Sequence, residues 1–230
     1  SNNDGISGKA NLVWNFSTNK TQVGRFGWKA NEPTLLQQVA SAFSGDIGLT
    51  NSVFPNKNCP SPQKDCNSEK NGGNPEVSDR QLNNIMVYSS SLSVPIRRNY
   101  DKKNVLNGKK LFRDMKCNSC HKEVFKTSDN YPFNPTLQNI TIRPFSDFLL
   151  HDMGEGLADN RSDYLANGKE WRTQPLWGLG LIQEVNKHNF LLHDGRARGI
   201  QEAILWHSGE AEKSKNSYKR LTKKDRENVL

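Results

Sequence analysis

A five-residue stretch near the middle of the chain constrains its fold most strongly. Cys117-Asn118-Ser119-Cys120-His121 has the C-x-x-C-H spacing at which haem is attached covalently to a protein. Two thioether bonds need cysteines about one helical turn apart, and the next histidine is then delivered under the iron. A haem would also supply apolar surface to a chain in which only 33% of the 230 residues are apolar. The motif therefore predicts one haem c, held by Cys117, Cys120 and His121.

The same two cysteines permit other interpretations. A redox-active dithiol of the thioredoxin kind shares the C-x-x-C spacing, but it follows a strand in a βαβ unit, and the sequence shows no such pattern. A zinc site needs a second pair of ligands, and Cys59 and Cys66 are too widely spaced to resemble one. The sequence favours haem, with the dithiol and zinc as alternatives.

Cys59 and Cys66 lie in a loop of the sequence NKNCPSPQKDC, which contains almost no apolar residue. Such a loop has no core, and in the loop-entropy model a disulfide would stabilise it by about 2–3 kcal/mol. The alternative is two free thiols. Because covalent haem and disulfides both belong to oxidising compartments, the two cysteine pairs together predict a periplasmic or otherwise extracytoplasmic protein.

The net charge of +8 bears on partners. Basic residues are scattered apart from a cluster between Lys213 and Arg226, and no nucleic-acid-binding signature is present, so nucleic acid is not expected as a partner. An acidic redox partner protein fits the charge better, and a solvated lysine-rich surface is the alternative. The chain contains no run of 18 apolar residues, so no membrane span is expected.

Helical periodicity marks several segments. Glu32–Asp46 carries an apolar stripe, with a glycine just before its end. Ser78 and Gln81 have the spacing of a capping box at the start of a second helix. A third amphipathic helix follows Asp101 and runs into the haem motif, and Gly199–Gly209 forms a short fourth. Residues 1–32 and 122–190 show no regular pattern, which indicates long loops that need an organising group.

The second face of the iron has seven candidate ligands: Met86, Met115, Met153, His151, His188, His193 and His207. Met86 and Met115 lie on apolar helical stripes, and His188 lies in a polar stretch. His207 shares one helical face with Ile200 and Ile204. A histidine on an apolar face loses about 1–3 kcal/mol unless its ring nitrogens find partners. Iron is one such partner, and a backbone carbonyl is the other.

Five blocks of sequence carry a resemblance to a known family. They read RFGWKANEPTLLQQ, CNSCH, FSDFLLHDMGEGLADNR, EWRTQPLWGLG and FLLHDGRARGIQEAILWHSGEAE. From Asp4 to Leu230 the sequence resembles the di-haem thiol oxidoreductase family, relatives of the bacterial di-haem cytochrome c peroxidases. That family has two cytochrome c-like domains, each with its own C-x-x-C-H motif. Since this chain has one motif, we expect it to be the second-haem half of a longer protein, with both ends truncated.

The resemblance also implies roles for single residues. In the peroxidases the position of His207 holds the distal ligand of the second haem. It is a methionine there, and a tyrosine in the relative that matures the cofactor of methylamine dehydrogenase. We therefore expect His121 and His207 to ligate the haem iron, with Met153 or an open or water-bound face as alternatives. Five residues are expected near the haem, the relay path or the domain interface: His151, Met153, His193, Trp177 and Trp206.

These points predict a fold class and a domain division. The chain is expected to be mostly α with little β, and to contain a cytochrome c-like domain whose long loops wrap the haem. Residues 101–230 would form this haem domain. Residues 1–100 would form an N-terminal segment with helices and the Cys59–Cys66 loop, belonging to the first-haem domain or the interdomain region.

The expected function follows from the coordination of the iron. An iron with protein ligands on both faces transfers electrons, whereas an open face binds peroxide. With His207 bound, this haem would relay electrons to a catalytic haem outside the chain, in a periplasmic, peroxidase-like di-haem oxidoreductase. The alternative is a stand-alone electron-transfer cytochrome without catalysis. The resemblance implies a second haem in the full-length protein, and a calcium ion between the domains is common in the peroxidase group.

Overall fold

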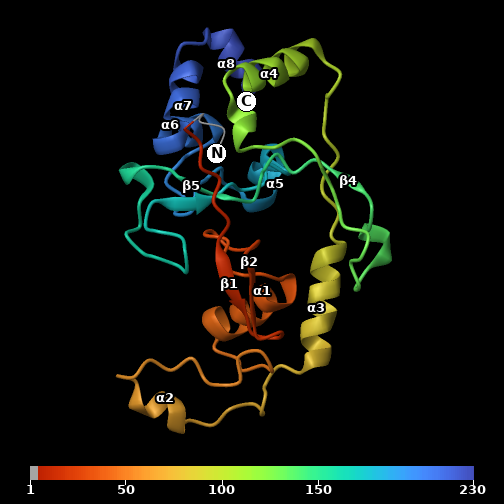
Figure 1. The fold of residues 1–230 in the computed structure, drawn as a ribbon, viewed down its shortest axis with the longest axis vertical. Helices are drawn as coiled ribbons and strands as arrows, with labels where there is room; N and C mark the ends of the chain where they lie inside the picture. The colour runs from red at the N-terminus through yellow and green to blue at the C-terminus, as the bar shows by residue number, and fades with distance from the viewer. Residues whose placement is uncertain (1–4) are drawn as a thin grey trace.

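The computed structural model describes residues 5–230 as an elongated molecule (Figure 1). A hairpin, α1 and α2 lie towards one end, α4 and α6 to α8 lie at the other, and α3 runs beside the hairpin end. The α-helices are α1 (Leu35–Ala42), α2 (Lys64–Ser68), α3 (Asp79–Ser91), α4 (Lys103–Asp114), α5 (Ile182–Asn186), α6 (Ile200–Trp206), α7 (Glu212–Lys219) and α8 (Lys223–Val229). The strands are β1 (Leu12–Asn15), β2 (Lys20–Val23), β3 (Phe125–Lys126), β4 (Thr141–Ile142), β5 (Leu150–Asp152) and β6 (Glu170–Arg172).

The predicted fold class is wrong. The sequence predicted a mostly α, cytochrome c-like domain, whereas 38% of the chain is helical and 12% is strand. Among residues 5–230 the longest helix, α3, has 13 residues, and the strands form three two-stranded antiparallel sheets, β1–β2, β3–β4 and β5–β6. The arrangement is not clearly that of a cytochrome c, because turns and loops, rather than long packed helices, make up much of the chain.

Polar side chains stabilise these loops by bonding to the backbone. The Oδ1 atom of Asn15 accepts hydrogen bonds from the backbone N–H groups two and three residues later in the chain. The Oδ1 atom of Asn51 does the same in its own loop. Asparagine, aspartate and serine compete with helices in this way, since their short side chains satisfy backbone groups locally. A sequence rich in these residues can therefore form ordered loops. The hydrophobic periodicity of such segments shows only that they are not helical.

The predicted helices are present, with shorter bounds in two cases. Thr34 caps α1, because its side chain accepts from the backbone N–H of Gln37, and a single π-helical turn, Phe43–Ile47, follows. The Ser78–Gln81 capping box at α3 is confirmed. The helix that runs into the haem motif is α4, and the short helix after Gly199 is α6, which ends at Trp206.

A hairpin in the first 32 residues was not predicted. β1 and β2 pair antiparallel, with Val13 opposite Gln22. The side chains of Val13 and Asn15 are buried, whereas those of Leu12 and Trp14 on the other face are 45% and 39% exposed. This period of two is the normal pattern of a half-buried strand, but it extends over only four residues, too few to be distinguished from a loop.

The hairpin segment is joined to residues 150–172, far along the chain. Lys9 pairs with the backbone of Leu150, and the buried Asn11 side chain donates to the carbonyls of Lys29 and Asp163. These contacts cross the predicted boundary at residue 100. The division into residues 1–100 and 101–230 stays a prediction.

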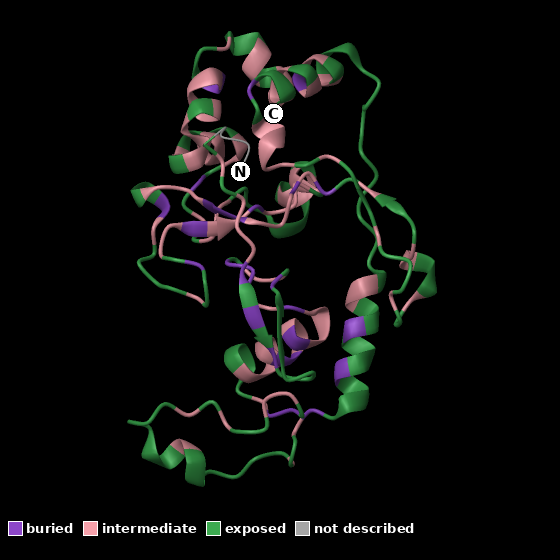
Figure 2. Cartoon of the chain, in the orientation of Figure 1, coloured by how far each residue is buried: buried purple, intermediate pink, exposed green. Residues whose placement is uncertain are grey.

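Buried residues are few and fall in small groups (Figure 2). One cluster contains Ala30, Leu150 and Ala166, and a second joins α1 to α3 through Ala40, Val77 and Leu82. The loop that contains α2 is almost wholly exposed, and there the Sγ atoms of Cys59 and Cys66 lie 1.96 Å apart. Between residues 5 and 230 no helix has the length and apolar character needed to cross a membrane.

Candidate haem site

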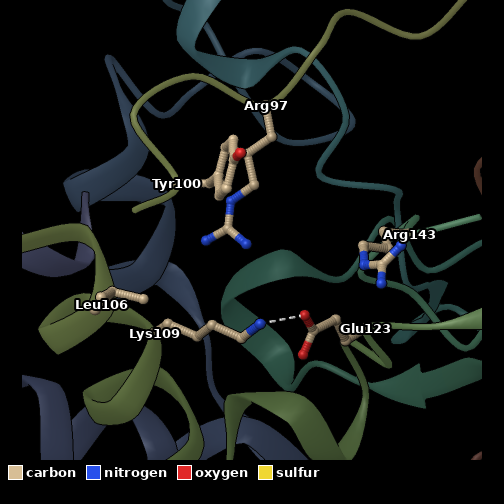
Figure 3. Close-up of a pocket in the computed structure, with 6 residues that line it drawn as sticks. All are labelled: Arg97, Tyr100, Leu106, Lys109, Glu123 and Arg143. Carbon is tan, nitrogen blue, oxygen red and sulfur yellow. Dashed lines mark hydrogen bonds and ion pairs between the residues drawn. The ribbon is translucent and has the colours of Figure 1, made fainter. Parts of the chain in front are cut away.

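The C-x-x-C-H motif lies directly after α4. The helix ends at Asp114, and Met115 is its C-cap. The backbone of Lys116 then takes a left-handed conformation with φ of 65°, and a 3₁₀ turn, Cys117–Ser119, follows. Beyond the motif, Glu123 pairs with Lys109 (Figure 3) and, at 2.6 Å, with Arg113; both partners lie on α4. The motif therefore begins just past a helix end, and the chain two residues beyond it is held to that helix by ion pairs.

Cys117 and Cys120 are not bonded to each other in the structure. Burial raises the pKa of the Cys117 thiol to about 11, so this cysteine is protonated at neutral pH. A thioredoxin-like dithiol depends on a thiol pKa lowered to near or below neutrality. The environment of Cys117 therefore does not favour the redox-dithiol alternative.

One ring nitrogen of His121 forms a hydrogen bond, and the other forms none with the described residues. Its Nδ1 atom lies 2.8 Å from the carbonyl oxygen of Phe145, so Nδ1 carries the proton and donates it. Burial lowers the pKa of His121 to about 4, which keeps the ring neutral at pH 7. No residue between 5 and 230 forms a hydrogen bond to its Nε2. A neutral imidazole whose Nδ1–H is held by a carbonyl presents the Nε2 lone pair to a metal.

His207 repeats this arrangement from another part of the chain. It is the first residue beyond α6, and its Nδ1 lies 2.7 Å from the carbonyl oxygen of Ala203. Burial lowers its pKa as well. The sequence allowed either iron or a backbone carbonyl as the partner of His207. The structure shows a carbonyl at Nδ1, while Nε2 has no hydrogen-bond partner among the described residues.

These residues fit a covalently bound haem by the chemistry of their donor atoms. The site offers two thiols at the attachment spacing and, next to them, a neutral imidazole with its Nδ1 held and its Nε2 free. A second imidazole in the same state belongs to His207, whose neighbour Ser208 donates to the carbonyl of Met153. Cys117, Cys120, His121 and His207 would hold the haem.

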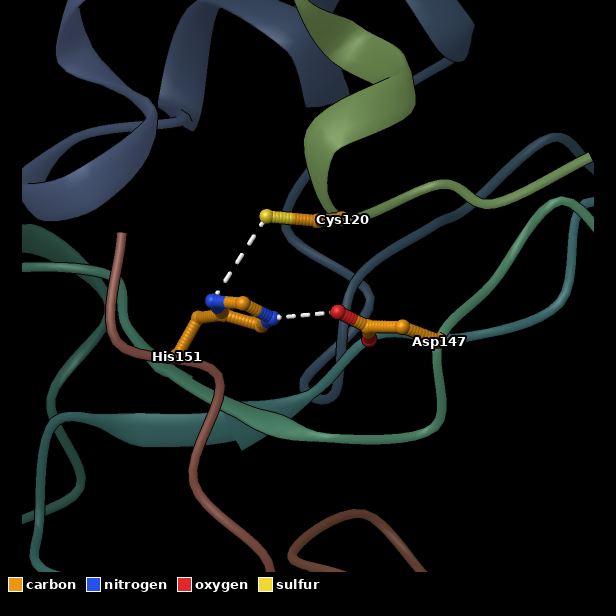
Figure 4. Close-up of side chains that lie close together, drawn as sticks. All are labelled: Cys120, Asp147 and His151. Atoms are coloured by element: carbon orange, nitrogen blue, oxygen red, sulfur yellow. Dashed lines mark hydrogen bonds and ion pairs between the residues drawn. The ribbon is translucent and has the colours of Figure 1, made fainter. Parts of the chain in front are cut away.

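His151 lies beside this site, between two carboxylates. Its Nε2 is 2.9 Å from Asp147, and its Nδ1 is 3.5 Å from the Sγ of Cys120 (Figure 4). The same Nδ1 is 2.8 Å from Glu210. Burial lowers the pKa of His151, but the hydrogen bonds to these three side chains outweigh it and raise the pKa to about 11. His151 is therefore an imidazolium that pairs with both acids, and Glu210 also accepts from the backbone N–H of Ser7.

Cys120, Asp147 and His151 have ligand atoms within 4.8 Å of one another, which is close enough to hold a metal ion. Both ring nitrogens of His151 already face carboxylates, so a metal ion bound here would have to displace a proton and one of these partners. Zinc stays an alternative. The calcium ion that the resemblance implies stays a prediction.

The other predicted neighbours of the haem occupy different surroundings. Met153 bonds through its backbone carbonyl to the hydroxyl of Ser208, beside His207. His193 stacks on Trp171 with ring centroids 3.7 Å apart and lines a cavity of about 380 Å³, separate from the motif. Trp177 donates to the carbonyl of Arg143, and Trp206 lies under the guanidinium of Arg196. The roles of these residues stay predictions.

Sequence reasoning missed three contributors to the site. Phe145 supplies the carbonyl that orients His121, and Asp147 and Glu210 pair with His151. A backbone carbonyl leaves no trace in residue identity, so Phe145 could not have been found. Asp147 and Glu210 lie four residues before His151 and three after His207, but a nearby carboxylate is too common to single out.

Comparison with known proteins agrees with this geometry. No curated protein and no solved structure matches the chain. The model of one family, described as "Di-haem oxidoreductase, putative peroxidase", matches residues 1–230. The family description implies haem as the cofactor. The chain belongs to this family of di-haem oxidoreductases.

Proposed function

We propose that this chain is the electron-relay portion of a periplasmic, peroxidase-like di-haem oxidoreductase. It holds one haem c through Cys117 and Cys120, with His121 and His207 on the two faces of the iron. The relay passes electrons to a catalytic haem that these 230 residues do not attach. When bound, the haem supplies a centre that gains and loses one electron.

The observation that carries this proposal is the matched state of the two histidines. Each ring is neutral, each Nδ1 is held by a backbone carbonyl, and each Nε2 is left over. Rings fixed in this way keep their orientation when the charge on a neighbouring group changes, because the backbone does not titrate. Two protein ligands leave no open position for peroxide, which favours electron transfer over catalysis at this site.

The proposed location is supported by the second pair of cysteines. Their Sγ atoms lie at bonding distance within an exposed loop, as expected for a protein in an oxidising compartment. Intact-mass measurement of protein from the periplasm, with and without reduction before alkylation, tests this. Two alkyl groups added at Cys59 and Cys66 without reduction would contradict an oxidised pair.

The direct test is an absorption spectrum of the haem-loaded protein, oxidised and reduced, with and without cyanide. We expect a low-spin spectrum that cyanide does not change. The variant His207→Ala should turn high-spin and bind cyanide, whereas His188→Ala, at an exposed histidine, should behave as wild type. A wild-type protein that binds cyanide at once would overturn the His207 assignment and make this haem the place to look for peroxide chemistry.

The alternative of a stand-alone cytochrome is tested by the complete coding sequence. A second C-x-x-C-H motif in the same protein supports the relay. Its absence would favour an electron carrier without catalysis of its own.

A further inference from the structure

Two residues beyond the haem motif, Glu123 contributes to a cavity of about 450 Å³, whose lining is Arg97, Tyr100, Leu106, Lys109, Glu123 and Arg143 (Figure 3). The lining comes from three separate parts of the chain: the segment between α3 and α4, α4 itself, and the residues around β3 and β4. Figure 3 shows the guanidinium of Arg97 directed towards the Lys109–Glu123 pair.

The cavity has an excess of positive charge. Its one carboxylate, Glu123, is already paired with Lys109 and with Arg113 beyond the lining. Arg97 and Arg143 form no ion pair with any carboxylate in residues 5–230, and both side chains are exposed. Two free guanidinium groups at one cavity favour an anionic occupant that brings its own carboxylates.

The rim of the cavity carries two hydrophobic side chains that are open to solvent. Tyr100 is 64% exposed and Leu106 is 52% exposed. Exposed apolar side chains next to unpaired arginines are typical of protein–protein contact surfaces, in which arginine and tyrosine are enriched. A small free anion would use the charges but not this rim.

The cavity is also connected to the proposed iron ligand. The guanidinium of Arg97 lies 5.7 Å from the ring centroid of Phe145, whose carbonyl accepts from His121. The ring of Phe112 neighbours both Phe145 and His121, with its centroid 6.2 Å from that of Phe145 and 6.1 Å from that of His121. A protein that docks at Arg97 would therefore face the aromatic groups behind His121.

We infer that this cavity and its rim are the docking surface for an acidic electron-donor protein, whose carboxylates pair with Arg97 and Arg143. This inference rests on the proposed relay function, since a donor is needed only if the haem at His121 transfers electrons. The overall charge of +8 would attract such a partner, and the cavity fixes where it binds.

The test uses haem-loaded protein and reduced plant-type ferredoxin, an acidic iron–sulfur protein, as the probe. Stopped-flow rates of haem reduction are measured at ionic strengths of about 0.01 M and about 0.15 M, where charges are screened beyond roughly 30 Å and 8 Å. The double variant Arg97→Glu/Arg143→Glu should lower the second-order rate constant at least about tenfold at low ionic strength, and the difference should shrink at high ionic strength.

The matched control is Arg25→Glu/Arg80→Glu, which makes the same charge change at two exposed arginines outside the cavity. It should change the rate constant less than about threefold, as expected for a general effect of net charge. Equal slowing by both double variants would overturn the docking site. A cavity variant whose haem is reduced as fast as that of wild type would also overturn it. So would a result in which citrate slows the reduction of wild type at constant ionic strength while the double substitution leaves the rate constant unchanged.

Failure of the relay itself would look different. Dithionite reduces the haem of every variant if the relay proposal holds, and the low-spin spectrum stays unchanged. A haem that is high-spin in wild type contradicts the proposed function. A low-spin spectrum, together with a rate constant for reduction by ferredoxin that the cavity substitutions do not change, contradicts only the docking surface.

Discussion

His121 and His207 hold their rings in the same way: each Nδ1 lies against a backbone carbonyl oxygen, 2.8 Å away at Phe145 and 2.7 Å away at Ala203. One carbonyl belongs to a loop and the other to α6. The same tautomer is thus imposed on both rings by independent parts of the fold, and that equivalence underlies the proposed bis-histidine iron.

The first prediction concerns the reduction potential. Two imidazole ligands give a lower potential than one imidazole and one thioether, so His207→Met should raise the potential of the haem by on the order of 0.1 V, within the roughly 0.8 V that axial ligands span. Spectroelectrochemical titration of both proteins measures this. A potential and spectrum equal to those of wild type would show that residue 207 does not contact the iron.

The second prediction concerns pH and stability. Hydrogen bonds to Asp147, Cys120 and Glu210 raise the pKa of His151 from 6.5 to about 11 against the opposing effect of burial. Below about pH 6.5 the imidazolium exists in both the folded and unfolded chain, so its stabilising effect is complete. Between about pH 6.5 and about 11 the unfolded chain has lost this proton while the folded chain keeps it, so the free energy of unfolding should fall as the pH rises.

Urea unfolding of the haem-free protein, in which Cys120 is a free thiol as in the structure, tests the second prediction at several pH values across this window, with His151→Gln and His188→Gln as the pair of variants. The exposed-site variant His188→Gln should keep the wild-type slope, and His151→Gln should flatten it. A wild-type stability that is constant over the window would contradict the charge assigned to His151.

Sequence reasoning located what depends on spacing and periodicity. The Ser78 capping box, the helix ahead of Cys117 and the short helix before His207 follow from local patterns that the structure retains. The fold class did not follow, because loops held by side chains such as Asn15 and Asn51 carry no periodic signal. Contacts between distant segments were equally hidden.

Lys29 makes such contacts with a distant segment of the chain. In the sequence it is one basic residue among 32 lysines and arginines, yet its side chain is only 5% exposed. Its ammonium group pairs with Asp159 at 2.8 Å, donates to the carbonyls of Arg161 and Asn167, and lies 4.4 Å from the ring of Trp171. A lysine whose three donors are all satisfied by residues about 130 positions away cannot be recognised from local pattern.

The third prediction follows from that burial. Lys29→Met should lower the free energy of unfolding by about 3 kcal/mol, because it leaves Asp159 without its ion-pair partner and two carbonyls without a donor. Lys20→Met, at an exposed lysine of β2, should change stability by less than about 0.5 kcal/mol. Chemical denaturation of the three proteins gives both values, and similar effects at the two lysines would contradict the role of Lys29.

The last prediction concerns the helix that leads into the haem motif. Gly108 on α4 lies so close to α8 that a Cβ atom there would be 1.8 Å from the carbonyl oxygen of Asn228. Backbone cannot yield as a flexible side chain can, so Gly108→Ala should force the two helices apart and cost about 1–3 kcal/mol, although alanine favours helices. Gly45→Ala is the matched control, because a Cβ at Gly45 meets nothing within 4 Å. It should leave stability unchanged or raise it by up to about 1 kcal/mol. Thermal unfolding of both variants decides the matter: a Gly108→Ala protein as stable as the Gly45→Ala protein would show that α4 and α8 do not pack this closely.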